Sequence, residues 1–127
     1  HDNLPPREPP HIGDLMEEKI RAIISKYNML DSNIGRRIEN WLDDANKDGV
    51  IDRLSTFTED MLSDLDFDIR YLSQGKIPKG SGIQALHWAL TNRGTSAEMW
   101  QEIQDDMEVD VGATKFDEES FYGDYDE

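Results

Sequence analysis

The sequence predicts an all-α protein, a small bundle of about five helices with an extended proline-rich N-terminal arm and an acidic disordered C-terminal tail. Apolar residues recur at intervals of three and four along residues 12–107, which is the period of helices that bury one face. Four of the five prolines fall within residues 1–10, and no convincing strand pattern occurs. We therefore expect an arm over residues 1–11, a helical domain over 12–107 and a tail over 108–127.

The first three predicted helices each carry an apolar stripe. The first spans residues 12–27. Asp31 and Ser32 can cap the second, because their side-chain oxygens accept hydrogen bonds from the free amides of a helix N-terminus. Ser55 or Thr56 can cap the third in the same way. The stripes consist of Ile12, Met16, Ile20, Ile23, Ile24 and Tyr27; of Ile34, Ile38, Trp41, Leu42 and Ala45; and of Phe57, Met61, Leu65, Ile69 and Leu72.

Two shorter helices complete the predicted bundle. Gly75 and Pro78 end the third helix and open a glycine-rich connection. A fourth helix follows and stops near Asn92. Thr95 and Glu98 then have the spacing of a capping box, so the fifth helix is expected to begin there. The stripes of these two helices contain Ile83, Leu86, His87 and Leu90, and Met99, Trp100, Ile103 and Met107.

The charge of the chain is strongly negative. Thirteen basic and twenty-eight acidic residues leave a formal net charge of −15. Direct binding to nucleic acid is therefore electrostatically unfavourable, whereas a basic protein partner, such as a nucleic-acid-binding protein, would be attracted. Solubility alone is the other interpretation of this charge.

Composition also bears on location. The chain has no cysteine and no apolar run that could span a membrane. A soluble protein is expected, in the cytoplasm or the interior of a host cell. Because the chain begins at His1, a fragment or a processed product is one interpretation.

We predict no enzymatic activity. Of the three histidines, His1 and His11 lie in or beside the proline-rich arm, and His87 lies on an apolar stripe. No serine stands in a nucleophile elbow. The carboxylates of Asp60, Asp64 and Asp68 recur at four-residue steps, which is typical of a solvated helix face.

One stretch points to specific chemistry. From residue 44 to residue 52, oxygen-bearing side chains alternate around Gly49. EF-hand loops take side-chain oxygens from positions one, three and five, glycine at six, a backbone carbonyl at seven and often a water-mediated ligand at nine. The stretch resembles such a loop. The resemblance implies a Ca²⁺ site whose ligands are Asp44, Asn46, Asp48, the carbonyl of Val50, and Asp52.

The loop also departs from the family pattern. Ser55 stands at the twelfth position in place of the bidentate glutamate, and no second loop of this kind occurs. Any calcium affinity is therefore expected to be weak. The same Asn-Lys-Asp-Gly residues fit a solvated turn between two helices, which needs no metal.

The predicted tail combines acidic and aromatic residues. Aromatic rings can anchor in the apolar pockets of a partner while carboxylates steer its approach. The candidate partner-binding residues are Phe116, Phe121, Tyr122 and Tyr125. Two other interpretations stay open: a solubilising tail, or a tail folded back on Lys76 and Lys79 of the same chain.

The leading functional hypothesis is a non-catalytic protein-interaction module that binds a basic protein through its acidic surface and tail. The first alternative is a calcium-binding structural or regulatory domain that uses residues 44–55. The second is a viral or phage inhibitor that mimics nucleic acid, in which carboxylates imitate the spacing of phosphates.

Overall fold

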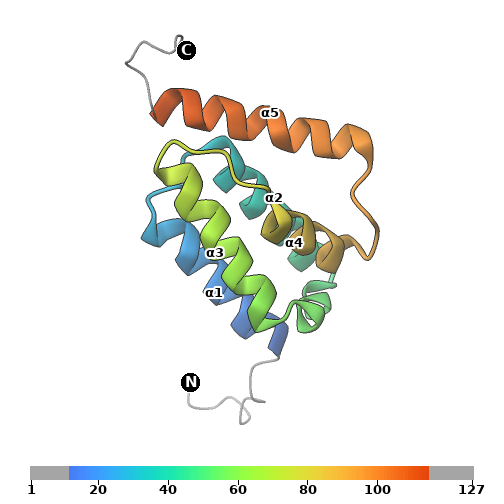
Figure 1. The fold of residues 1–127 in the computed structure, drawn as a ribbon. Helices are drawn as coiled ribbons and strands as arrows, with labels where there is room; N and C mark the ends of the chain where they lie inside the picture. The colour runs from blue at the N-terminus through green and yellow to red at the C-terminus, as the bar shows by residue number, and fades with distance from the viewer. Residues whose placement is uncertain (1–11, 115–127) are drawn as a thin grey trace.

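The structure is a computed structural model that describes residues 12–114, and over this range it is all-helical (Figure 1). The predicted all-α bundle is confirmed. The predicted arm and residues 115–127 of the predicted tail lie outside the described residues. The helices are α1 (Ile12–Lys26), α2 (Asn33–Lys47), the 3₁₀ helix η1 (Ile51–Thr56), α3 (Glu59–Ser73), α4 (Ser81–Thr91) and α5 (Ala97–Thr114).

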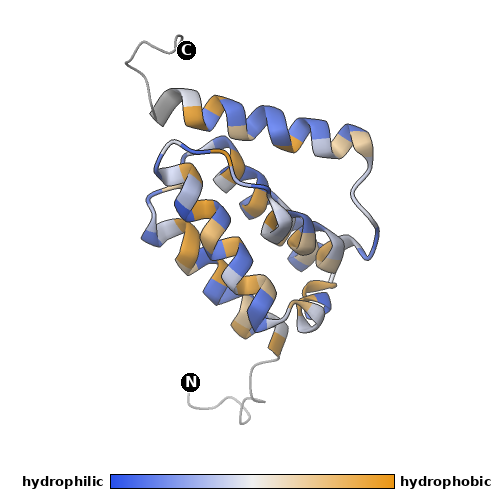
Figure 2. Cartoon of the chain, in the orientation of Figure 1, coloured by the Kyte–Doolittle hydropathy of each residue, from blue (hydrophilic) through white to orange (hydrophobic). Residues whose placement is uncertain are grey.

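Four α-helices and η1 form the body of the bundle, and α5 lies across it (Figure 1). α3 packs on α4, α1 packs on η1, and α5 packs on α2 and α3. Hydrophobic and hydrophilic residues alternate along each α-helix, α5 included (Figure 2). None of the described helices is long and apolar enough to cross a bilayer. The fully buried core contains Phe57, Ile20, Ile24, Ile34, Ile38, Leu42, Leu54, Leu65, Ile69, Leu72, Ile83 and Leu86.

The start of α2 is confirmed and the start of α3 is not. The Ser32 hydroxyl accepts a hydrogen bond from the Gly35 amide at 2.8 Å, as a cap should. The prediction that Ser55 or Thr56 caps the third helix is wrong, because both residues lie in η1 and Thr58 is the cap of α3. The physical reason is burial of Leu54, which turns the chain through η1 before α3 begins.

The start of α5 also differs from the prediction. The Ser96 hydroxyl accepts a hydrogen bond from the Met99 amide at 3.0 Å, so Ser96 rather than Thr95 caps the helix. The Thr95 hydroxyl instead lies 3.1 Å from Nδ1 of His87. Sequence spacing alone could not show which of the two adjacent hydroxyls caps α5. The contact of Thr95 with His87 of α4 is visible only in the structure.

α5 continues to Thr114, seven residues past Met107, where the sequence predicts the tail to begin. The reason is Asp110, which is buried although acidic. Its carboxylate oxygens accept hydrogen bonds from the first amides of α2, those of Asn33 at 2.8 Å and Ile34 at 2.9 Å. Burial raises the pKa of Asp110, while these amides act in the opposite direction. A buried side chain of one helix therefore caps the N-terminus of another.

Asp68 has the same role at the start of α4. It is 2 % exposed, which corrects the expectation that it shares a solvated face with Asp60 and Asp64. Its Oδ2 atom accepts hydrogen bonds from the amides of Gly82 at 2.9 Å and Ile83 at 3.2 Å. The carboxylate thus compensates the free amides at the α4 N-terminus, which has no cap from its own side chain.

The same end of α4 lies against the backbone of α3. A Cβ atom added at Gly82 would lie 2.3 Å from the backbone nitrogen of Leu65. Only a residue without a side chain fits at this approach. The close α3–α4 packing that holds Asp68 beside the α4 amides therefore depends on Gly82.

We predict that Gly82→Ala lowers the free energy of unfolding by roughly 1–3 kcal/mol, because the new methyl group forces the two backbones apart. Chemical denaturation measures the change. Gly112→Ala in α5 is the matched control, since nothing lies within 4 Å of its Cβ position. The control should be neutral or stabilising, because alanine is the better helix former. Equal destabilisation by both variants would contradict the steric explanation.

We predict that Asp68 makes the protein less stable as pH rises. Burial raises the pKa of this carboxyl to about 6 from an ordinary 3.8. The folded state therefore binds the proton more tightly than the unfolded state, and this stabilisation is present at low pH and lost as pH rises through about 6. Asp68→Asn should reduce the difference in unfolding free energy between pH 5 and pH 8 by about 1 kcal/mol.

Denaturation at the two pH values measures this effect of Asp68. Asp60→Asn, an exposed change on the same helix, is the control and should leave the pH dependence as it is in the parent. The interpretation fails if Asp68→Asn has the same pH dependence as the parent.

Candidate functional site

The stretch that resembles an EF-hand loop forms the end of α2 and the turn that follows it. Residues 44–47 are helical, and Gly49 adopts the left-handed conformation with φ +74°. The Gly49 amide donates to the Asn46 carbonyl at 3.1 Å and the Val50 amide donates to the Ala45 carbonyl at 2.8 Å. These two bonds define a Schellman motif, the common way in which a helix ends at glycine.

The structure brings together only part of the predicted calcium-ligand set. Asp44 and Asp48 line one cavity, whereas Asp52 lines another, together with Ser55. The Asn46 amide group donates to Glu17 of α1 at 3.0 Å. Within residues 12–114, no three His, Asp or Glu side chains are close enough together to hold a metal ion. Calcium binding remains a prediction that would require this loop to rearrange.

The Val50 carbonyl, the predicted backbone ligand, already has a partner. It accepts a hydrogen bond from the Arg53 amide at 2.9 Å, in the first turn of η1. A carbonyl oxygen has two lone pairs and can serve a second partner. The other predicted ligands would still have to move toward it.

The cavity that holds Asp44 and Asp48 is the larger of these two and measures about 480 Å³. It lies among the end of α2, the start of η1, the end of α4 and the connection to α5. Its volume is in the range of small-ligand sites. Its lining consists of Trp41, Asp44, Ala45, Asp48, Val50, Arg53, His87, Leu90, Thr91, Arg93, Gly94, Ser96 and Met99.

His87 lies on the wall of this cavity and is largely buried. Its ring lies 5.2 Å from the ring of Trp41, measured between centroids. Burial lowers the pKa of His87, and the positive charges of Arg37 and Arg93 lower it further. The imidazole is therefore neutral near pH 7, where it can exchange hydrogen bonds but carries no charge.

Two arginines line the same cavity and escaped the sequence analysis. Nη1 of Arg53 donates to the Leu90 carbonyl at 3.0 Å, and Arg93 belongs to the α4–α5 connection. Neither residue stands in a motif, so no sequence signal links them to Asp44 and Asp48. Two carboxylates and two guanidinium groups make the cavity wall polar and nearly balanced in charge. This arrangement suits binding of a small polar group, and it contains no acid–base pair at hydrogen-bonding distance.

The outer side of α5 is the second candidate for a site. This helix contains six acidic residues and no basic one. Glu98, Glu102, Asp105 and Val109 follow spacings of four, three and four residues and therefore share one face. The three carboxylates on this face are exposed, and Val109 is 58 % exposed. We call this surface the α5 acidic face.

The aromatic residues predicted to bind a partner lie outside the described residues. Phe116, Phe121, Tyr122 and Tyr125 all follow Thr114. Their part in binding therefore remains a prediction from the sequence.

The resemblance to an EF-hand loop gives a direct test. Millimolar calcium should shift the backbone amide resonances of residues 44–52, because the last turn of α2 has to unwind to supply ligands. Asp44→Ala/Asp48→Ala should abolish the shifts, and magnesium at the same concentration serves as the control ion. Two-dimensional NMR and calorimetry measure the response. Absence of any calcium response would reduce the stretch to a helix-ending turn.

Residues 12–114 therefore contain two candidate sites: the cavity at the end of α2 and the α5 acidic face. Comparisons with protein-family models, with curated proteins and with solved structures found no match to this chain.

Proposed function

We propose that this protein is a non-catalytic interaction module that binds a basic protein through the α5 acidic face and the acidic segment that follows it. The observation that carries the proposal is the charge of the C-terminal part of the chain. Six acidic residues lie in α5 and six more lie in residues 115–127, against a single lysine. Residues 97–127 thus hold twelve of the twenty-eight acidic residues of the chain.

Three of the six α5 carboxylates are available to a partner; Glu102 is not among them, because it pairs with Arg37 at 3.4 Å. Asp106 is paired with Arg37, and Asp110 caps α2, so these two acids serve the fold. Glu98, Asp105 and Glu108 are exposed and form no salt bridge with any residue between 12 and 114. Their potential would attract lysine and arginine side chains and raise the rate of association.

Repulsion within the α5 acidic face supports the same proposal. Like charges three or four residues apart on a helix each cost about 0.2–0.5 kcal/mol. A basic partner would relieve this repulsion on binding. Val109 adds an exposed apolar contact among the acids, and apolar area contributes affinity that salt does not screen.

Charge reversal of the exposed, unpaired acids of α5 tests the proposal; Glu98 and Asp105 belong to the α5 acidic face, and Glu108 lies beside it. Glu98→Lys/Asp105→Lys/Glu108→Lys should weaken binding to a lysine- and arginine-rich peptide by roughly tenfold or more. The substitutions leave the pairs of Arg37 intact. Calorimetry at two salt concentrations measures affinity, and the parent should lose affinity as salt increases.

A second variant with the same net charge distinguishes an effect of the α5 acidic residues from an effect of the net charge of the protein. Glu18→Lys/Asp60→Lys/Asp64→Lys reverses three exposed acids on α1 and α3. This control should retain most of the affinity of the parent. Equal losses in both variants would mean that net charge, and no particular face, attracts the peptide, which would contradict the proposal.

A further inference from the structure

A groove between α1 and α3 differs in character from the rest of this acidic protein. It measures about 430 Å³. Ala22, Ile23, Leu62 and Phe67 give it an apolar lining, and Lys19, Ser63, Asp66 and Arg70 surround that lining with polar groups. Such a combination of apolar floor and charged rim is typical of a surface that receives a side chain from a peptide.

Aromatic rings and cations extend the groove along α3. The rings of Phe67 and Tyr71 stack with centroids 4.8 Å apart. The Arg70 guanidinium lies 5.4 Å from the Phe67 ring, and the Lys76 ammonium lies 5.2 Å from the Tyr71 ring. Phe67 is nevertheless 43 % exposed, a large apolar area for a side chain beside cations. We call this surface the α1–α3 basic–aromatic face.

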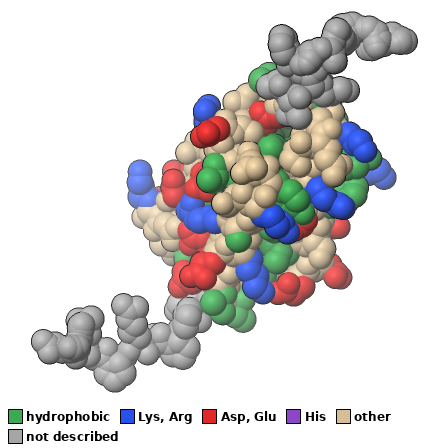
Figure 3. Space-filling view, turned by 90° about the vertical axis from the view of Figure 1, so that its left-hand side faces the viewer, with side chains coloured by type: hydrophobic (Ala, Val, Ile, Leu, Met, Phe, Trp, Pro, Cys, Tyr) green, Lys and Arg blue, Asp and Glu red, His purple; other side chains and the backbone are tan. Residues whose placement is uncertain are grey.

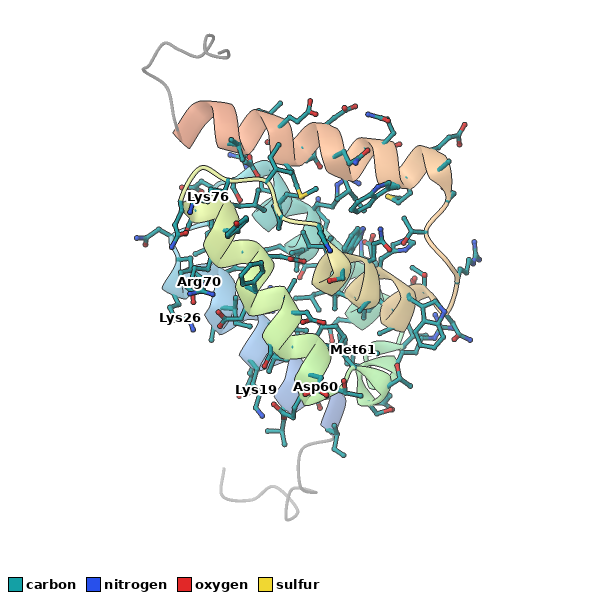
Figure 4. All side chains as sticks on the ribbon, viewed as in Figure 1. Lys19, Lys26, Asp60, Met61, Arg70 and Lys76 are labelled. Atoms are coloured by element: carbon teal, nitrogen blue, oxygen red, sulfur yellow. The ribbon has the colours of Figure 1, made fainter. Side chains whose placement is uncertain are left out.

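The cations of this face are available for further charge pairing. Arg70 and Lys76 form no salt bridge with a carboxylate of the described residues. Lys19 pairs with Glu59 at 3.0 Å and Lys26 pairs with Asp66 at 2.8 Å, and exposed pairs of this kind are weak. Figure 4 shows the four cations along one side of the molecule, from Lys76 at the end of α3 to Lys19 on α1.

The surface view agrees with this distribution. Figure 3 looks at the molecule from the side of these residues and shows Lys and Arg side chains beside hydrophobic ones, with carboxylates between them. The face therefore offers both positive charge and apolar area. Its complement is a segment that carries carboxylates and aromatic rings together.

We propose that residues 115–127 of this same chain bind the α1–α3 basic–aromatic face. The segment contains six acidic residues and one lysine, and its four aromatic residues are interspersed among the acids. Carboxylates would pair with Arg70 and Lys76, and an aromatic ring would enter the groove beside Phe67. Charge and apolar character are thus complementary in the two parts of one chain.

The end of α5 is placed for this binding. Asp110 contacts Asn33 and Ile34 at the start of α2, and the segment begins one helical turn later. That end of α5 lies near the ends of α1 and α3 (Figure 1). Thirteen extended residues reach about 40 Å, whereas the fifteen residues of α3 are only about 22 Å long.

This binding does not depend on the basic partner proposed above. The α5 acidic face would remain accessible to a partner while the segment is bound to the cations of the α1–α3 basic–aromatic face. Where both proposals hold, residues 115–127 cannot bind Arg70 and Lys76 and a basic partner at the same time. The partner would have to displace the segment from Arg70 and Lys76 before it could bind the segment. The segment would then regulate how much acidic surface the protein presents.

A spin label on the segment tests the proposal in the full chain without any partner. The chain has no cysteine, so Gly123→Cys gives a single attachment site. Paramagnetic broadening measured by NMR should be strongest at amides of residues 19–26 and 67–76 and absent at residues 44–52. Broadening should decrease at about 1 M salt, where the Debye length is about 3 Å.

Two variants of the labelled protein decide the outcome. Arg70→Glu/Lys76→Glu should abolish the selective broadening, and Phe121→Ser/Tyr122→Ser should reduce it. Lys47→Glu/Arg93→Glu makes the same change in net charge at positions away from the groove. This control should leave the selective broadening intact. Uniform broadening, no broadening, or an unchanged pattern in Arg70→Glu/Lys76→Glu would overturn the proposal.

A mixed sample separates binding within one chain from binding between two copies. Labelled protein without ¹⁵N is added to unlabelled protein that carries ¹⁵N. The proposal expects no selective broadening in this mixture. Broadening at residues 19–26 and 67–76 there would assign the face to the segment of a second copy and would overturn binding in cis.

Discussion

The hydrogen bonds between the Asp110 carboxylate and the amides of Asn33 and Ile34 determine where the C-terminal part of the chain lies. α5 buries few large apolar side chains, chiefly Ile103 and Met107. A carboxylate at a helix N-terminus compensates the free amides and the positive end of the helix dipole. These hydrogen bonds from the start of α2 to Asp110 thereby hold α5 across the bundle. They set the direction of the α5 acidic face and the point at which residues 115–127 leave the fold.

The charged residues of this protein serve distinct purposes, so the net charge alone describes its surface poorly. Some acids are internal: Asp68 and Asp110 cap helices of which they are not part. Arg21 gathers three acids from α1 and α2, namely Glu17, Glu39 and Asp43. The exposed groups left for partners include three carboxylates along α5 and, on the α1–α3 basic–aromatic face, the cations Arg70 and Lys76. An acidic protein can therefore offer two surfaces of opposite sign.

The helices could be predicted from the sequence because their apolar stripes are regular and their ends carry specific residues. Ser32 and Gly75 mark such ends in both the prediction and the structure. Two of the errors arose where an acidic residue is buried. Asp68 and Asp110 stand in sequence among other acids, and only the amides of a distant helix distinguish them. The cavity was missed for a similar reason, since its arginines come from segments without a motif.

The stretch at the end of α2 shows why one pattern can fit two structures. A Schellman motif needs glycine just after the helix and an apolar residue next to it that packs back on the last turn. An EF-hand loop also needs glycine at a sharp turn, with polar residues before it. Gly49 and Val50 satisfy both requirements, and in the structure their amides bond to carbonyls of α2. A cation at this stretch would therefore compete with the hydrogen bonds that end the helix.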